Sequence, residues 1–528
     1  MPSRGRPPAG RTIGLIAALI VTVVCAHPAR AADEIHWTIT GPGSVTFDWR
    51  GPENVVHFGR LNHDLLLTAI ATPASPVPVS SPGPFWEARI TGLQPGSLYY
   101  YTVGSGAMHT FRTAPPAGAS NFKVCVAGDI GNATSFMRMG VIQTMIAGEQ
   151  PNLVLMVGDL TYGNILTEAD VDRHFNDVMS WSQDAAYMPA WGNHEWDQTT
   201  DDLRNYKGRF DFPNAHSSPT APDSADVAGA LPPYGEDWYW FDYGNARFIA
   251  IPDPYTYGVG GPWANWFANV AAVMDQAQND PSIAFIVTFG HRPVYTSGNY
   301  SPGDLTLRAY LDGLGGTYGK YVLDLCGHSH DYERSLPQAN VTHITAGTGG
   351  APLENTKVPA CLWKSGCPAP AWSAYRAMHH AVVTLRFTPV AIEGRVLCGP
   401  PGDTTNTLND ITCVQGSVID SFTIRNPAVL AAMPPAELEF GIDPVRPNPA
   451  LGEFRLSYRL AGFAPATLDL LDAAGRLLAT RRVGSLGPGT HQARFDASQA
   501  PPGVYFVRLR QAGRMATSRI TLLASGTR

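Results

Sequence analysis

Short apolar runs that stop at a potential metal ligand are the feature of this sequence that most constrains its fold. The run 154–157 is followed by Gly158 and Asp159, and Tyr162 lies three residues further on. An apolar run of this length bounded by glycine is typical of a buried strand in an α/β sheet covered on both faces. Ligands usually bind at the carboxyl ends of such strands. The run therefore predicts a functional site at its end.

Four more apolar runs repeat the pattern. They end in Asp129, in Asn193, in His291 and in the pair His328 and His330. A single Gly-Asp pair would be weak support for a site, because it is also an ordinary turn signal. Five runs in series, ending in carboxylates, an amide and imidazoles, are hard to explain as turns. The series therefore indicates one site assembled from several strand ends of an α/β domain.

These motifs resemble those of the metallophosphoesterase superfamily, which run GD, GDxx, GNH[ED], a lone His and GHxH. Tyr162 extends the second motif to GDxxY, as in the purple acid phosphatases, where the tyrosine binds a ferric ion. The resemblance covers about residues 121–425. It implies a four-layer α/β/β/α sandwich, and we expect all-β sandwich domains on both sides of it.

The resemblance also implies a binuclear metal centre. Its donors include no thiolate, which suits hard or borderline ions, and seven donors are too many for one catalytic ion that keeps open positions. The implied ligands are Asp129, Tyr162 and His330 for a ferric ion, Asn193, His291 and His328 for a divalent ion (Zn, Fe, Mn or Mg), and Asp159 as a bridge.

Such a centre implies hydrolysis of small phosphomonoesters. Two ions ~3.5–4 Å apart polarise a phosphate and produce a hydroxide nucleophile, and a ferric ion favours an acidic optimum. His194 follows Asn193 directly and is the candidate general acid. Plant-type members place two histidines beyond the lone ligand His. Asn299, Tyr300 and Ser301 occupy that stretch here, so we expect the first two to be candidate substrate contacts.

Alternative interpretations stay open at this stage. A phosphodiesterase or nucleotide pyrophosphatase of the same superfamily would need room for a second ester group. A non-catalytic surface binding protein would have no reason to retain all seven donors. If Tyr162 is only an aromatic residue at the rim, the chain is a metallophosphoesterase without the ferric site.

At 528 residues the chain is too long for one hydrophobic core. Residues 34–114 alternate in short strands, and the pattern from Leu93 to Tyr99 resembles a fibronectin type III sandwich, whose Tyr bonds back to the main chain. A stand-alone binding module is the alternative for this segment. Residues 119–425 are the expected catalytic domain, and 426–449 a Pro-rich linker. Residues 450–528 resemble immunoglobulin-like C-terminal domains of bacterial secreted proteins, some of which are sorting signals.

Residues 1–31 combine a basic start, the apolar run 13–24 and the segment Ala29-Arg-Ala31. This order is typical of a secretory signal peptide, and the run is shorter than the ~20 residues that a membrane span needs. We expect cleavage near Ala31, no transmembrane segment, and a periplasmic, extracellular or cell-surface location. Contact with a cell surface or with secretion machinery would then involve the C-terminal domain.

The formal net charge of −7 argues against nucleic-acid binding through a basic face. Export permits disulfides, and six cysteines follow the signal peptide. The stretch 216–233, rich in Ser, Pro, Ala and Asp, predicts a long surface loop near the site mouth. The sequence predicts two disulfide-closed loops, Cys361 with Cys367 and Cys398 with Cys413, and two free buried thiols, Cys125 and Cys326.

Overall fold

The computed structural model describes residues 31–131, 138–163, 167–195, 202–217, 235–253, 263–354, 363, 367–401, 412–426, 440–461, 465–483, 489–498 and 500–523. Residues 1–30 of the expected signal peptide, Cys361 and most of the stretch 216–233 lie outside these ranges.

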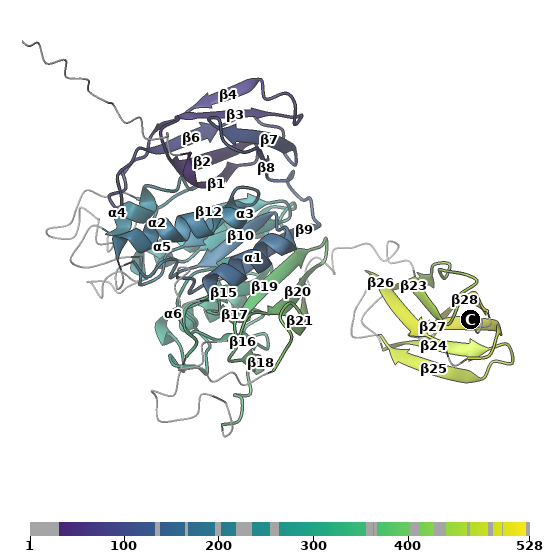
Figure 1. Cartoon of the computed structure of the whole chain (residues 1–528). Helices are drawn as coiled ribbons and strands as arrows, with labels where there is room; N and C mark the ends of the chain where they lie inside the picture. Colours follow the sequence, from purple (N-terminus) through teal and green to yellow (C-terminus); the bar gives the residue numbers. More distant parts are fainter. Residues whose placement is uncertain are drawn as a thin grey trace, which may run out of the picture.

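The first unit is a β-sandwich of two four-stranded sheets, with strand orders β1-β2-β6-β5 and β4-β3-β7-β8 (Figure 1). The amide of Gln94 donates to the hydroxyl of Tyr99 at 3.1 Å, which is the main-chain bond expected of this tyrosine. The strands are β1 (Asp33–Gly41), β2 (Ser44–Arg50), β3 (Val55–Gly59), β4 (Leu67–Ile70), β5 (Thr72–Pro73), β6 (Phe85–Ile90), β7 (Leu98–Val103) and β8 (His109–Arg112).

The catalytic unit contains two mixed sheets. One has the order β11-β10-β9-β19-β20-β21, and the other the order β12-β13-β14-β15-β17-β16-β18. The strands of the first sheet are β9 (Phe122–Ala127), β10 (Leu153–Val157), β11 (Ala186–Ala190), β19 (Ala381–Phe387), β20 (Ala391–Cys398) and β21 (Val418–Arg425). Those of the second are β12 (Trp240–Tyr243), β13 (Ala246–Ala250), β14 (Phe285–Phe289), β15 (Tyr321–Cys326), β16 (Tyr332–Ser335), β17 (Thr342–Ala346) and β18 (Ser373–Ala377).

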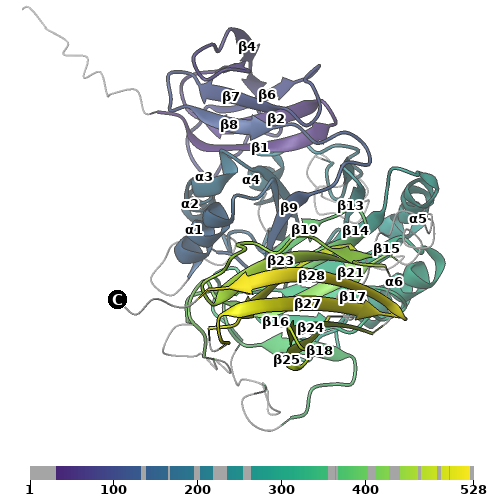
Figure 2. The same ribbon diagram turned by 90° about the vertical axis from the view of Figure 1, so that its right-hand side faces the viewer.

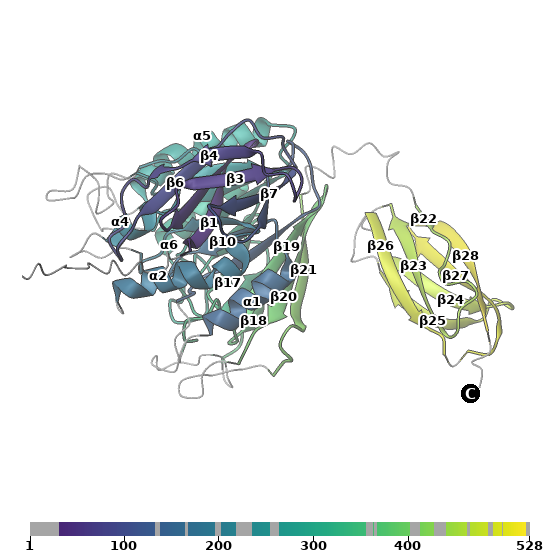
Figure 3. The ribbon, with the colours of Figure 1, turned by 45° about the horizontal axis from the view of Figure 1, so that its top comes forward.

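Helices cover the outer faces of both sheets. Figure 2 shows α1, α2 and α3 on one side of the strands and α5 and α6 on the other, and Figure 3 shows α5 on the side away from α1 and α2. The predicted four-layer α/β/β/α architecture is therefore confirmed. The helices are α1 (Met139–Glu149), α2 (Glu168–Asp177), α3 (Met179–Ser182), α4 (Asp202–Lys207), α5 (Ala264–Asn279) and α6 (Leu305–Thr317).

The N-terminal sandwich and the catalytic unit share one hydrophobic core. Strand β1 is buried on both faces, although its sequence alternates apolar and polar residues. Ile35, Trp37 and Ile39 belong to the core, while His36 and Thr38 bond the main-chain oxygens of Arg209 and Asp211. The polar face of β1 thus packs against the catalytic unit.

The C-terminal unit is a second β-sandwich with a core of its own. It begins with β22, inside the stretch 426–449 for which the prolines predicted a linker, because Gly441 and Ile442 pair with Arg459 and Tyr458 of β23. Its sheets have the orders β22-β23-β26 and β25-β24-β27-β28. The strands are β22 (Gly441–Ile442), β23 (Glu453–Leu460), β24 (Ala466–Asp472), β25 (Leu477–Arg482), β26 (Gly489–Asp496), β27 (Gly503–Gln511) and β28 (Arg514–Leu522).

Candidate metal centre

The predicted ligands follow strands that run side by side. β9, β10 and β11 are adjacent and parallel, so their carboxyl ends lie at one edge, followed by Asp129, Asp159 and Asn193. β14 and β15 are parallel neighbours in the other sheet and are followed by His291 and His328. The two sheets thus bring all five predicted strand ends to one region.

The backbone at these strand ends is strained. Positive φ angles of 56° at Asp129, 51° at Asp159, 57° at Tyr162 and 67° at His328 put four of the seven predicted ligands in the left-handed region. Residues with a Cβ rarely adopt this conformation, and such strain clusters at functional sites. The unfavourable backbone conformation at these four residues therefore sets the direction of the predicted ligand side chains.

One group of donors gathers around Asp129. Nε2 of His330 lies 3.1 Å from Oδ1 of Asp129 and 3.0 Å from the hydroxyl of Tyr162. The other ring nitrogen of His330 donates to the main-chain oxygen of Pro352 at 2.6 Å. Because that bond fixes the proton on Nδ1, Nε2 keeps its lone pair directed at the other donors, as a metal-ligating histidine requires.

A second group gathers around His291. Its Nε2 atom lies 3.1 Å from Oδ1 of Asn193, 3.2 Å from Oδ1 of Asp159 and 3.2 Å from Nδ1 of His328. Its Nδ1 atom is 3.0 Å from the main-chain oxygen of Val157, to which it donates. Nε2 of His291 is therefore also available as a ligand.

Asp159 belongs to both groups. Ligand atoms of Asp159, His291 and His328 lie within 4.8 Å of one another, and so do those of Asp129, Asp159 and His330. A carboxylate shared by two donor groups fits the binuclear metal centre that the sequence resemblance implies.

Electrostatics also fit cations at this position. Both aspartates are buried, and each has a histidine ring nitrogen within 3.2 Å of its carboxylate. Burial lowers the pKa of His291, but the carboxylates of Asp159, Asp129 and Asp253 together raise it more, to about 10. Burial also lowers the pKa of His330. The neighbouring Asp129 carboxylate raises it, and the resulting pKa is about 9. The buried carboxylates therefore favour a positive charge beside them, which either a second proton on these rings or a metal ion in its place can supply.

Glu195 supports this arrangement, and the sequence had given it no role. Its buried carboxylate accepts hydrogen bonds from the amides of Asp159 at 2.8 Å, Leu160 at 2.7 Å and Gly192 at 2.7 Å. It ties the turn after β10 to the turn after β11. The only sequence signal was its place in the Gly-Asn-His-Glu motif.

The candidate general acid His194 lies beside these donors. Its amide donates to Oδ1 of Asp159 at 2.9 Å, and its Nε2 atom lies 3.9 Å from Oδ2 of the same residue. Its ring centroid is 4.4 Å from that of Tyr162. Burial lowers the pKa of His194 from its ordinary value.

Asn299 and Tyr300 line a pocket of about 180 Å³ that also includes His328, His330 and Glu354. The ring of Tyr300 stacks on that of His328 with centroids 3.7 Å apart. The amide of Asn299 donates to Oε2 of Glu354 at 2.7 Å. The two candidate substrate contacts therefore lie next to the predicted ligands.

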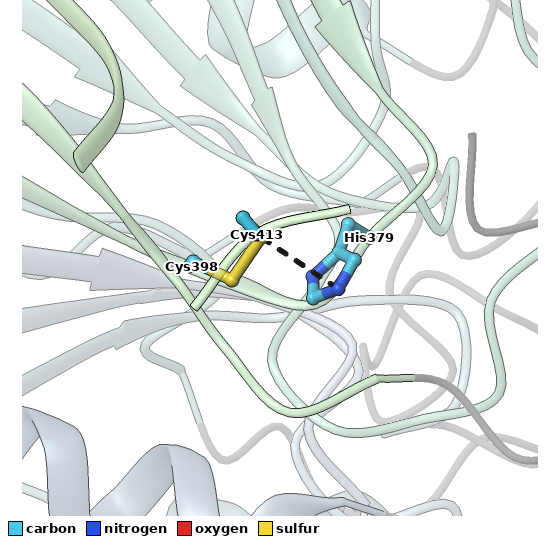
Figure 4. A group of neighbouring side chains, drawn as sticks. All are labelled: His379, Cys398 and Cys413. Carbon is cyan, nitrogen blue, oxygen red and sulfur yellow. Dashed lines mark hydrogen bonds between the residues drawn. A yellow bond between two sulfur atoms is a disulfide. The ribbon is translucent and has the colours of Figure 1, made fainter. Parts of the chain in front are cut away.

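A further cluster of His379, Cys398 and Cys413 is not a metal site in this form of the protein. Figure 4 shows the predicted disulfide between Cys398 and Cys413, with His379 beside it. Sulfur atoms joined in a disulfide are not thiolate ligands. Cys125 and Cys326 are free and buried as predicted. Cys367 is disulfide-bonded, and its predicted partner lies outside the described residues.

Comparison with known proteins supports these structural observations. Residues 122–332, which include all seven predicted ligands, match the calcineurin-like phosphoesterase family. Acid phosphatase type 7 of Homo sapiens is 27% identical over 68% of this chain and 86% of its own length. Purple acid phosphatase 15 of Arabidopsis thaliana is 25% identical over 56% of this chain, and the match spans 61% of its own length.

A solved purple acid phosphatase, PPD1 from seeds of yellow lupin (Lupinus luteus), has the same fold. Its TM-score is 0.56 at 19% identity, over 76% of both chains. The fibronectin type III family of the N-terminal sandwich stays a prediction.

The C-terminal sandwich also matches a known family. Residues 445–522 match the secretion system C-terminal sorting domain, which points to secretion or the cell surface. Within the part of the chain that is described, no helix is both long enough and apolar enough to cross a membrane. The family match within the catalytic unit and the similar acid phosphatases together make this unit similar to calcineurin-like phosphoesterases of the purple acid phosphatase type.

Proposed function

We propose that this chain is a secreted acid phosphatase that hydrolyses small phosphomonoesters at a centre of two metal ions. The observation that carries the proposal is the position of Asp159, which is shared by two groups of donors from five strand ends. Relatives named as acid phosphatases support the choice of reaction.

The ligand roles follow the two groups of donors. The phenol and the carboxylates suit a ferric ion, while the amide and two imidazoles suit a divalent ion. The proposed ligands are Asp129, Tyr162 and His330 for the ferric ion, Asn193, His291 and His328 for Zn, Fe or Mn, and Asp159 for both.

When bound, the two ions would polarise the phosphate and supply a hydroxide nucleophile at acidic pH. His194 would donate a proton to the leaving oxygen, since the Asp159 carboxylate fixes its main chain beside the proposed ligands. Asn299 and Tyr300 would contact the leaving group in the adjacent pocket of about 180 Å³. This small volume favours a monoester over a diester with a second large group.

Asp159→Asn tests the proposal most sharply. It should remove phosphomonoester hydrolysis and lower the metal content together, because both ions lose a ligand. Asp324→Asn is the matched control, since Asp324 is also buried and also contacts a histidine, His343, at 3.0 Å. Near wild-type activity in Asp159→Asn would refute the bridging role.

The reaction class needs a second measurement. Hydrolysis of a phosphomonoester and a phosphodiester should be compared from acidic to alkaline pH. A monoester preference with an acidic optimum is expected. A diester preference or an alkaline optimum would instead indicate a general metallophosphoesterase, with Tyr162 at the rim of the site.

A further inference from the structure

The C-terminal sandwich is opposite in charge to the rest of the chain. Residues 445–522 contain eleven arginines, no lysine and four acidic residues, which gives them a formal net charge of +7. The whole chain has a formal net charge of −7, so the remaining residues carry −14. Such an asymmetry within one chain indicates that the basic part interacts with an anionic partner. The position of the arginines in the fold shows which surface faces that partner.

Four of these arginines lie on the outer face of the sheet β25-β24-β27-β28 (Figure 2). Leu468, Val507 and Ile520 of this sheet belong to the core, so their neighbours in sequence point outward. Residues paired across adjacent antiparallel strands share a face. The outward arginines are Arg482 on β25, paired with Thr467, Arg508 and Arg510 on β27, and Arg519 on β28.

A single carboxylate accompanies these four arginines. Asp469 is the only acidic residue among the outward positions of the four described strands, and its side chain is 1% exposed. It accepts from Arg508 at 3.2 Å and lies 2.8 Å from Nη2 of Arg510. The side chain of Arg510 is 54% exposed, and Arg482 and Arg519 are exposed. The surface of this face is therefore positive, with a net charge of +3.

The outer face of the other sheet, β22-β23-β26, is balanced in charge. Arg494 donates to Glu453 on the adjacent strand, and Arg459 donates to Asp443 at 2.5 Å. The outward positions of β23 and β26 also include Arg455 and Asp496. Three arginines thus lie among three acidic residues. The excess positive charge of the strands is therefore confined to the β25-β24-β27-β28 face.

A surface of anionic lipid headgroups fits the positive face. A sheet presents the side chains of adjacent strands side by side over a broad area, and guanidinium groups match the geometry of phosphates. Met515, paired with Arg510, is 65% exposed and offers an apolar side chain to the boundary below the headgroups. The sorting-domain match of residues 445–522 points to secretion or the cell surface, where lipid is at hand.

We propose that the outer face of the β25-β24-β27-β28 sheet binds anionic lipid headgroups, with Arg482, Arg510 and Arg519 as its principal contacts. The net charge of the whole chain opposes such binding, so the attraction must come from this local surface. The inference does not depend on the phosphatase function.

Vesicle sedimentation tests the inference on the chain without residues 1–31, because an apolar signal peptide would bind lipid by itself. At about 0.1 M salt the protein should bind vesicles of phosphatidylcholine with about 30% phosphatidylglycerol, and it should not bind phosphatidylcholine alone. Raising the salt to about 0.5 M should release it, since the attraction is electrostatic.

A triple variant locates the binding face. Arg482→Gln, Arg510→Gln and Arg519→Gln together should weaken binding to the anionic vesicles about a hundredfold, because each arginine near such a surface contributes about tenfold or somewhat less. Arg508 stays in place as a partner for Asp469. Thermal unfolding of the C-terminal domain checks that the fold is retained.

The matched control removes the same charge from the balanced face, with the changes Arg455→Gln, Arg459→Gln and Arg494→Gln. The two sheets of a sandwich lie about 10 Å apart, and their outward side chains are further apart than the screening length of about 10 Å at 0.1 M salt. This control should therefore bind the anionic vesicles within about threefold of wild type.

Equal losses of binding in the two triple variants would overturn the inference, as would wild type that does not bind the anionic vesicles. Tighter binding of wild type to a DNA duplex than to these vesicles at the same salt would reject lipid as the partner. If the first triple variant does not fold, Arg482→Gln with Arg519→Gln leaves both arginine partners of Asp469 and decides instead. A loss of about tenfold or more supports the proposal, and a smaller loss overturns it.

Discussion

The two β-sandwiches of this chain relate differently to the catalytic unit. The N-terminal sandwich shares a core with it and contributes buried charges to their common interface. The C-terminal sandwich has a separate core, with buried residues between 445 and 522 and with Phe440 and Ile442 packed against them. Two small sandwiches of similar architecture therefore have different structural roles. The N-terminal one is a structural part of the catalytic unit, and the C-terminal one is a self-contained domain that matches a sorting family.

Buried ion pairs join the N-terminal sandwich to the catalytic unit. Arg209 donates to Glu34 at 2.8 Å and to Asp172 at 2.6 Å, and Arg50 donates to the second oxygen of Asp172 at 2.7 Å. These groups come from β1, β2, α2 and the segment after α4, and they are largely buried. Buried ions tolerate separation poorly, because each would lose its partner without gaining full hydration.

The largest expected effect comes from Arg209→Met. It leaves two buried carboxylates with one fewer cation, so we expect a loss of about 3–5 kcal/mol in the free energy of unfolding of the catalytic unit. Urea denaturation measures this change. Arg386→Met, in an exposed pair with Glu393, is the control and should lose less than about 1 kcal/mol. Equal losses of unfolding free energy in Arg209→Met and Arg386→Met would contradict the claim that the N-terminal sandwich and the catalytic unit form one structural unit.

Phe454→Ala tests the other sandwich. Phe454 is buried in the C-terminal core against Phe495, so its truncation should destabilise that domain by about 3–5 kcal/mol. Calorimetry of the full chain should show a lower transition temperature for this domain and an unchanged catalytic transition. A parallel shift of both transitions would show that the C-terminal sandwich is coupled to the rest.

A smaller effect should appear in how the stability of the catalytic unit depends on pH. His174 on α2 donates to the main-chain oxygen of Gly131 and accepts from the hydroxyl of Tyr187, and burial lowers its pKa to about 3. The unfolded chain binds this proton near pH 6.5, so stability is full above that pH and falls as the pH decreases toward 3. Between pH 7 and pH 4.5 the loss should be about 2–3 kcal/mol.

His174→Gln provides the comparison for that pH dependence. Glutamine can make both hydrogen bonds without titrating, so thermal unfolding of this variant should depend less on acidic pH than that of wild type. An identical pH dependence in the two proteins would exclude His174 as its source.

The smallest expected effect follows deletion of residues 427–528. Because none of the described residues in this stretch belongs to the shared core, the catalytic transition temperature and the phosphomonoester kinetics should stay unchanged. Secretion should be lost, because the deleted part includes the match to the sorting domain. Calorimetry and cell fractionation measure the two outcomes. A destabilised catalytic unit would contradict the separation of the two cores.

The sequence predicted the parts of the structure that depend on local pattern. Apolar runs and their polar ends located the strands β9, β10, β11, β14 and β15. It could not predict that β1 is buried on both faces, since the alternation from Ile35 to Ile39 is also typical of a strand with one exposed face.

The same limit applies to the site. Glu195 accepts hydrogen bonds from amides that follow another strand. Arg292 contacts His328, which lies 36 residues further along the chain. Neither contact leaves a local pattern in the sequence, because each depends on how the turns after separate strands meet.

Metal analysis combined with hydrolysis tests the central claim most directly. We predict two metal ions per chain in the purified protein, loss of phosphomonoester hydrolysis when a chelator removes them, and recovery when iron and a divalent ion are returned. Full hydrolysis by protein without metal, or a single ion per chain at full activity, would contradict the two-metal centre around Asp159.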